Sequence, residues 1–345
     1  MTMRDLPLLP TMGVGSYATP GWLFLFRGHM REEAGPADID EAFEDATRIA
    51  IADQVEAGID VITDGELRRM RFVYEMYDRL DGMERVPPAR RLGVPGYDRA
   101  PKFTAVERLT APAGLGIVGE YRQLRRICPD RPVKIAFPGP MTFARNIAPG
   151  AVYDGDRTLL IEDIVAIVQA EVAALVEAGA DLVQLDEPGF ANPPEGVGHE
   201  EAAAAINAAL AGQRERTAVH VCFGNNASRP YVRRDFARLF PALGRLDCRM
   251  LLLEFANREM ADLDRLPELA ERYDIAAGVI DVKSFHEETP EEVAERIRRV
   301  LRHVPAERLA VTADCGFSAI PRWLARAKLQ AMAAGARIVR AELGR

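Results

Sequence analysis

The chain has 345 residues, of which 48% are hydrophobic and 28% are charged, and its formal net charge at pH 7 is −8. A chain of this size and apolar content can bury one large core, so we expect a single domain over residues 1–345, with two separate domains as the alternative. The acidic, intermixed charge argues against a nucleic-acid partner, which needs a basic surface. The apolar runs are too short to cross a bilayer and the N-terminus has no signal-peptide pattern, so we expect a cytoplasmic protein with no membrane partner.

Short apolar runs alternate with helical patterns along the whole chain. The predicted strands, several of them apolar on both faces as in a parallel sheet, are residues 11–14, 60–63, 133–136, 182–185, 218–222, 250–254, 275–279 and 309–312. The predicted helices include residues 41–58, 159–179, 289–304 and 321–343. This alternation predicts an α/β fold of the (β/α)8 TIM-barrel type, and an open doubly wound sheet is the alternative.

The ends of the predicted helices carry start and stop signals. Thr289 precedes Pro290, which suits the first position of a helix, and Gly58 and Gly179 follow the last turns of two others. These signals fix the helix boundaries more closely than periodicity alone.

Two segments interrupt the alternation. Residues 67–132 form a long insertion between the second and third predicted strands, rich in Pro, Gly and Arg. Structureless loops of this length are uncommon, so we expect an extra hairpin or a lid there, with a plain surface insertion as the alternative. Residues 17–38 contain the apolar run GWLFLF, which suits a dimer contact, a pocket cover or core packing.

The residues that follow the predicted strands are the candidates for chemistry, because the active sites of (β/α)8 barrels lie at the carboxyl ends of the strands. Most of these ends are polar, ionisable or metal-binding: Gly15-Ser16, Asp64-Gly65-Glu66, Pro138-Gly139-Pro140, Asp186-Glu187-Pro188, His220 with Cys222, Glu254, Asp281 with Lys283, and Asp314-Cys315-Gly316. We therefore expect a polar site at one end of the barrel.

His220, Cys222, Glu254 and Cys315 form a candidate metal site. His220 and Cys222 are two residues apart on a strand and so face the same side, while Glu254 and Cys315 follow later strands. An imidazole, two thiolates and a carboxylate suit zinc rather than magnesium or calcium. A nucleophilic pair of Cys222 and His220 is the alternative, although no oxyanion loop is evident.

The charge of this ligand set indicates its chemistry. Three anionic ligands on a dication polarise a carbonyl poorly, but they suit the binding of a substrate thiol as a nucleophilic thiolate. The site therefore predicts alkyl transfer to sulfur. Four cysteines are too few for a disulfide framework, and we interpret the remaining two, Cys128 and Cys248, as small buried hydrophobic residues.

These strand-end motifs, in order along nearly the whole chain, resemble the catalytic barrel of cobalamin-independent methionine synthases in a short, core-only form. The resemblance implies a Zn²⁺ site on the residues His220, Cys222, Glu254 and Cys315. It also implies homocysteine-binding positions at Ser16, at Glu66 in TDGELRR and at Asp186 in LDEP, with the two carboxylates on the substrate ammonium group.

Two positions depart from the pattern of the family. Asn146 stands where the family has a folate-stacking tryptophan, and Lys283, in DVKSF, replaces a histidine that assists the folate leaving group. We take Lys283 and His286, three residues on, as the catalytic candidates. Lys283 would act as a cation or a general acid with a lowered pKa. The alternative is an ion pair with Asp281 or with a strand-end carboxylate.

The resemblance and the departures together predict a zinc-dependent transferase that moves a methyl group to homocysteine or a similar small thiol. We expect a donor other than free methyltetrahydrofolate, such as a methyl group on a corrinoid protein. One alternative is a zinc-dependent alkyltransferase that joins another thiol to a non-methyl electrophile, similar to epoxyalkane:coenzyme M transferase. Others are an inactive metal-binding barrel and a barrel of the uroporphyrinogen decarboxylase kind, which needs no zinc. Both a monomer and a homo-oligomer agree with the sequence.

Overall fold

The centre of the fold is a six-stranded parallel sheet with the order β3-β5-β6-β7-β8-β9. We analysed a computed structural model, which describes residues 6–27, 33–69, 72–87, 102–225, 229–230 and 232–344. The strands of this sheet are β3 (Lys134–Pro138), β5 (Leu182–Asp186), β6 (Thr217–Val221), β7 (Met250–Glu254), β8 (Asp274–Ile280) and β9 (Leu309–Ala313). The predicted strands from residue 133 onward are therefore confirmed, with small shifts at their ends.

The two predicted strands at residues 11–14 and 60–63 are wrong in extent. Isolated parallel bridges take their place: Thr11 with Val311, Met12 with Val61, and Ile62 with Val133. One reason is that the Asp60 carboxylate accepts hydrogen bonds from the Thr11 backbone N and from its Oγ1, both at 2.8 Å, so a side chain replaces part of the ladder. The bridges connect β9 to β3 through these two segments, which gives the pairing order of a (β/α)8 barrel.

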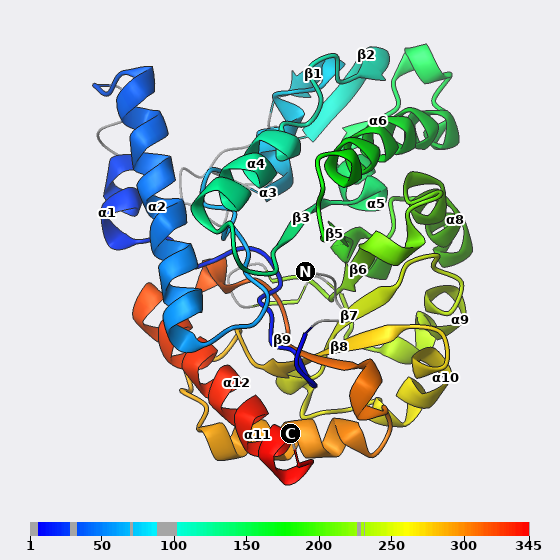
Figure 1. Ribbon diagram of the computed structural model, residues 1–345. Coiled ribbons are helices and arrows are strands. Elements are labelled where there is room, and N and C mark those ends of the chain that lie inside the picture. The colour runs from blue at the N-terminus through cyan, green and yellow to red at the C-terminus, as the bar shows by residue number, and fades with distance from the viewer. Residues whose placement is uncertain are drawn as a thin grey trace.

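Helices surround the sheet, as Figure 1 shows. The longer ones are α2 (Pro36–Ala57), α4 (Ile117–Ile127), α6 (Arg157–Glu177), α8 (His199–Ala209), α11 (Pro290–Leu301) and α12 (Arg322–Glu342). The short ones are α1 (Gly21–Leu25), α3 (Phe72–Tyr77), α5 (Pro140–Ala144), α7 (Pro188–Ala191), α9 (Phe240–Leu243) and α10 (Leu266–Ala270). No helix in the described ranges combines the length and the apolar character that crossing a membrane requires.

The predicted capping signals act as expected. Thr289 caps α11: its Oγ1 accepts a hydrogen bond from the Glu292 backbone N, and the Glu292 carboxylate accepts one from the Thr289 backbone N at 2.7 Å. Gly58 ends α2 with φ of 85°, a left-handed conformation that glycine adopts without steric cost. The ends of these helices thus follow from local sequence.

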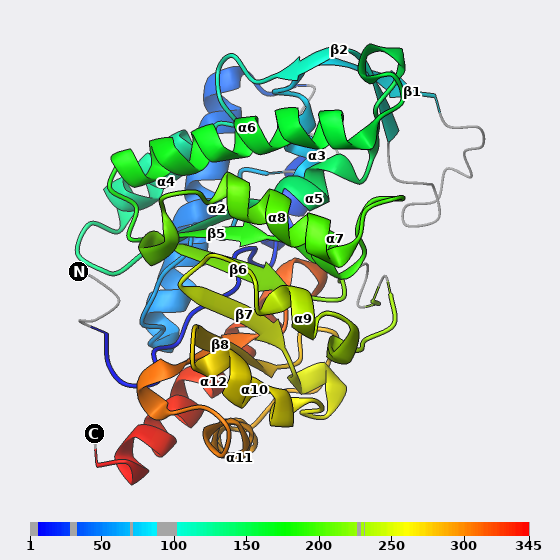
Figure 2. The ribbon, with the colours of Figure 1, turned by 90° about the vertical axis from the view of Figure 1, so that its right-hand side faces the viewer.

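Residues 67–132 contain α3, α4 and a hairpin of β1 (Asp81–Val86) with β2 (Lys102–Thr110). β2 also pairs in parallel with β4 (Ile147–Ala148), which completes a three-stranded sheet. Figure 2 shows this small sheet beyond α6, away from the main sheet. Residues 88–101 lie outside the described residues, and a lid function of the insertion stays a prediction.

The earlier excursion, residues 17–38, contains α1. Leu23 of this helix is buried, whereas Trp22, Phe24 and Leu25 are exposed. Residues 28–32 lie outside the described residues. The alternatives of a dimer contact and a pocket cover therefore stay predictions, and core packing applies to Leu23.

The inner face of the sheet positions the site. The interior cluster includes Met250 and Leu252 on β7, whereas Leu251 and Leu253 belong to the larger cluster between sheet and helices. Because side chains alternate between the faces of a strand, Glu254 continues the inner face of β7. The same alternation continues from Ala218 to His220 on β6, so these candidate metal ligands lie next to the interior cluster, on the side of the carboxyl ends of the strands.

Candidate active site

A cavity of about 330 Å³ opens at the carboxyl ends of the strands. Its size lies within the usual range of small-molecule sites. The lining contains these predicted site residues: Ser16, Glu66, Asp186, His220, Cys222 and Cys315. Residues from distant parts of the chain thus meet in one cavity, whereas Glu254, Lys283 and His286 are not part of its lining.

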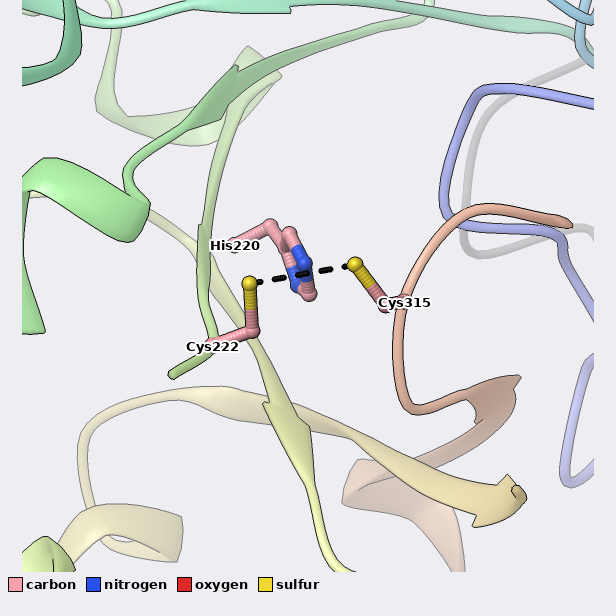
Figure 3. Close-up of side chains that lie close together, drawn as sticks. All are labelled: His220, Cys222 and Cys315. Carbon is pink, nitrogen blue, oxygen red and sulfur yellow. Dashed lines mark hydrogen bonds between the residues drawn. The ribbon is translucent and has the colours of Figure 1, made fainter. Parts of the chain in front are cut away.

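His220, Cys222 and Cys315 form a compact cluster in this cavity. Their ligand atoms all lie within 4.8 Å of one another, and the two Sγ atoms are 3.9 Å apart. Figure 3 shows the three side chains pointing toward one another, with His220 and Cys222 from the end of β6 and Cys315 from the loop after β9. This geometry suits three ligands of a single ion.

The cluster also favours ionised sulfur. The hydrogen bond from Cys222 lowers the pKa of the Cys315 thiol well below its ordinary value, with a further contribution from His220 against the effect of burial. The same hydrogen bond raises the pKa of Cys222 well above its ordinary value. One thiolate is therefore already stabilised by the surrounding protein groups.

His220 of the cluster and the nearby Glu254 lack hydrogen bonds that buried polar atoms normally make. Within the described residues, neither ring nitrogen of His220 has a hydrogen-bond partner, nor has Oε1 of Glu254. Such atoms are rare in proteins unless a ligand or a metal satisfies them. Together with the imidazole and thiol donors, this observation fits a zinc ion.

Glu254 ends β7 and is fully buried, but it lies outside the group of three. Its Oε2 forms an ion pair with Lys283 Nζ at 2.8 Å and accepts a hydrogen bond from the Phe223 backbone N at 3.3 Å. Lys283 thus forms an ion pair with a strand-end carboxylate, which was one of the alternatives that the sequence left open. Burial lowers the pKa of Lys283, but the Glu254 carboxylate outweighs burial, so the pKa is raised and the lysine is a cation.

His286 lies away from the cavity. Its side chain is 55% exposed and its Nε2 is 3.0 Å from Glu292 Oε1 in the first turn of α11. The structure therefore brings Lys283 to the cluster but does not bring His286 there.

The carboxylates expected to bind an ammonium group also face the cavity. Glu66 is buried, its Oε1 has no hydrogen-bond partner among the described residues, and its Oε2 is 3.6 Å from Arg69 Nη1. Asp186 ends β5, and its Oδ1 accepts a hydrogen bond from Gln184 Nε2 at 2.6 Å. Burial raises the pKa of Glu66 and of Asp186, so a cationic ligand between them would be strongly favoured.

Comparison with known proteins identifies the family. A family model described as the catalytic domain of cobalamin-independent synthases matches residues 9–337. The chain belongs to the cobalamin-independent methionine synthase family. It is therefore a methyltransferase of this family, as the motifs predicted.

Members of the family similar to this chain have nearly its length. A methionine synthase of Sulfurisphaera tokodaii is 33% identical, over 99% of this chain and 95% of the relative. One from Saccharolobus solfataricus is 31% identical, over 99% and 98%. A solved B12-independent methionine synthase of a Shewanella species, in complex with selenomethionine, is 29% identical with a TM-score of 0.81, over 97% of this chain and 99% of that one. This chain thus aligns with nearly the whole length of each of these relatives.

Asn146 and Lys283, which we predicted to depart from the folate pattern of the family, lie in different places. Lys283 is next to the cluster, as described. Asn146 lies at the small sheet, where its backbone O accepts a hydrogen bond from the Phe103 backbone N at 2.9 Å. Asn146 is also absent from the cavity lining.

Two buried charged residues that were not predicted as site residues, Arg69 and Asp314, support the site. Arg69 is buried and bridges Glu66 to Glu120, with Nη2 at 2.7 Å from Glu120 Oε2. A signal existed, because a cavity with several carboxylates requires a buried cation and the TDGELRR motif supplies one. Asp314 accepts hydrogen bonds from the backbone N of residues 255, 256 and 257 and so holds the loop after Glu254.

Proposed function

We propose that this chain is a zinc-dependent methyltransferase that transfers a methyl group to the thiol of homocysteine. One observation carries the proposal: a single cavity contains both the cluster of His220, Cys222 and Cys315 and the carboxylates Glu66 and Asp186. A thiol amino acid has a sulfur atom for the cluster and an ammonium group for the two carboxylates. We propose a cytoplasmic location, because thiol ligands stay reduced there.

We propose His220, Cys222 and Cys315 as the zinc ligands, with Glu254 Oε1 as the fourth donor. The unpartnered nitrogens of His220 and the unpartnered Oε1 of Glu254 support this assignment. When bound, zinc lowers the pKa of a substrate thiol, so that the sulfur is nucleophilic at neutral pH.

The protein residues orient the acceptor. Glu66 and Asp186 hold its ammonium group by charge-assisted hydrogen bonds, which are stronger in a buried cavity than in water. Ser16 lines the same cavity and binds the amino-acid end of the substrate. These contacts direct the sulfur toward the cluster.

Lys283 supplies positive charge next to the reacting sulfur. Its Nζ pairs with Glu254, and its charge contributes to the lowered pKa of Cys315. Since its own pKa is raised, we assign it the role of a cation rather than of a general acid. We assign no role to His286, because it would first have to leave Glu292.

We propose that the methyl group comes from a corrinoid protein and not from free methyltetrahydrofolate. Asn146 in place of a stacking tryptophan and Lys283 in place of the histidine support this choice. The relatives named methionine synthase favour methyl transfer over transfer of a larger alkyl group.

The metal assignment is tested by zinc analysis of the purified protein. We expect about one zinc per chain, and a large loss of bound zinc in Cys315→Ser. Cys128→Ser is the matched control, because Cys128 is a buried cysteine at the end of α4, outside the cluster. Full zinc content in Cys315→Ser would show that the ligand assignment is wrong.

The reaction is tested by methionine formation from homocysteine with three donors in parallel: methyltetrahydrofolate, methylcobalamin and a methylated corrinoid protein. We expect methionine with the corrinoid protein and none with free methyltetrahydrofolate. Methionine from methyltetrahydrofolate would overturn the donor proposal. If zinc-loaded protein forms no methionine with any of the three donors, homocysteine is not the acceptor.

A further inference from the structure

Lys134 is a fully buried cation that the proposed mechanism does not use. It lies on β3, its side chain has no exposed surface, and its Nζ donates a hydrogen bond to Oε1 of Gln184 on the neighbouring strand β5. Gln184 is also fully buried. Its Nε2 donates to the Val14 backbone O at 2.9 Å and to Asp186 Oδ1 at 2.6 Å. A continuous chain of hydrogen bonds thus runs from Lys134 to the cavity.

The donor and acceptor chemistry of the groups gives this series of hydrogen bonds a direction. An ammonium group only donates hydrogen bonds, so the amide oxygen of Gln184 must face Lys134. The amide NH₂ group then faces the other way, where the Val14 carbonyl and the Asp186 carboxylate are both acceptors. Without Lys134, the amide oxygen of Gln184 loses its hydrogen-bond donor, while only the two acceptors on the other side still hold the amide in place. Lys134 therefore fixes the oxygen end of Gln184, and with it the position of the amide against the Asp186 carboxylate.

We propose that Lys134 is a positioning residue that acts through Gln184 to hold Asp186 in the orientation that binds the ammonium group of the acceptor amino acid. This inference rests on the proposed function, because it assigns the acceptor's ammonium group to Asp186. Lys134 is neither a lining residue of the cavity nor a member of the metal cluster, so it would act on binding through its neighbours.

The charge of Lys134 agrees with this role. Burial lowers the pKa of Lys134 to about 7, and the nearby carboxylates Asp186 and Glu66 oppose that shift. The lysine therefore carries its proton below neutral pH, and binding is best measured at about pH 6.5.

The test compares two thiols that differ only in the ammonium group: homocysteine and 4-mercaptobutanoate. Their dissociation constants are measured by calorimetry on zinc-loaded wild type and Lys134→Met. We expect the variant to bind homocysteine about tenfold more weakly, since it loses an oriented charge-assisted contact. Its affinity for 4-mercaptobutanoate should stay within about twofold of wild type. Equal losses for both thiols, or no loss for either, would overturn the proposal.

Gln184→Met tests the same proposal if Lys134→Met does not fold. We expect it to weaken homocysteine binding to the same extent, and the double variant to be no weaker than either single variant. Additive losses would mean that Lys134 acts by its charge alone and not through Gln184. The wild type tests the proposed function separately. If it binds the two thiols with equal affinity, the ammonium site itself is refuted; if it prefers homocysteine, a failure of the variants refutes only the role of Lys134.

Discussion

The buried ion pair between Lys328 and Glu288 anchors the segment that carries Lys283. Lys328 Nζ, on α12, is 2.6 Å from Glu288 Oε2, and the two side chains are 0% and 1% exposed. Lys328 also donates to the backbone O of His286 at 2.6 Å. We predict that Lys328→Met destabilises the fold and, by releasing residues 281–288, lowers methyl transfer.

The structure sets the size of this effect. Removing one partner of a buried pair costs about 3–5 kcal/mol. Glu288 keeps a hydrogen bond from the Asp281 backbone N at 2.9 Å and a contact with Arg296 Nη1 at 3.3 Å, so we expect the lower end, about 3 kcal/mol. Adding Glu288→Gln should recover much of the loss, because it removes the unpaired charge.

Urea unfolding followed by circular dichroism measures the free energy of unfolding of each variant. Glu342→Gln is the control: it lies on the same helix, but its ion pair with Arg298 is at the surface, so we expect a much smaller loss. A loss for Lys328→Met no larger than that of the control would refute the reasoning. So would a double variant that is less stable than Lys328→Met.

Two further predictions concern the site itself. A Cβ atom at Gly316 would lie 1.9 Å from Ser16 Oγ, while its φ of −66° accepts alanine, so Gly316→Ala should raise the KM for homocysteine by displacing Ser16. Gly119→Ala, where a Cβ meets nothing, is the control, and an unchanged KM would contradict a role of Ser16 in binding. Lys283→Met should lower kcat about tenfold or more while zinc content is kept, because Glu254 and the thiolates lose their cation. An unchanged kcat would exclude Lys283 from the reaction.

The positions of the candidate ligands could be predicted from the sequence because strands alternate with period two. Apolar residues at 218, 250 and 252 mark the inner face, and the same face then carries His220 and Glu254 at the strand ends. The insertion at 67–132 and the capping box of Thr289 were also visible as local patterns. All of these depend only on neighbouring residues in the chain.

Other features could not be predicted in this way. An ion pair of Lys283 with a strand-end carboxylate was one of the alternatives, but the sequence could not single out Glu254 as the partner. The contact of His286 with Glu292 and the hydrogen bond between Lys134 and Gln184 likewise depend on how the loops and strands meet in the folded chain. The pKa of Lys283 illustrates the point. Burial alone would lower it, and only the distance to Glu254 shows that the carboxylate wins.

The sequence by itself determined the fold class, the family and the residue types of the proposed metal site, because these depend on local periodicity and on the order of the strand-end motifs. The tertiary structure alone decided that His220, Cys222 and Cys315 form one cluster, that Glu254 shares its carboxylate with Lys283, and that the carboxylates face the same cavity. The physical reason is that electrostatic and hydrogen-bond energies depend on distances of a few ångströms between side chains. Such distances exist only once the strands are packed side by side.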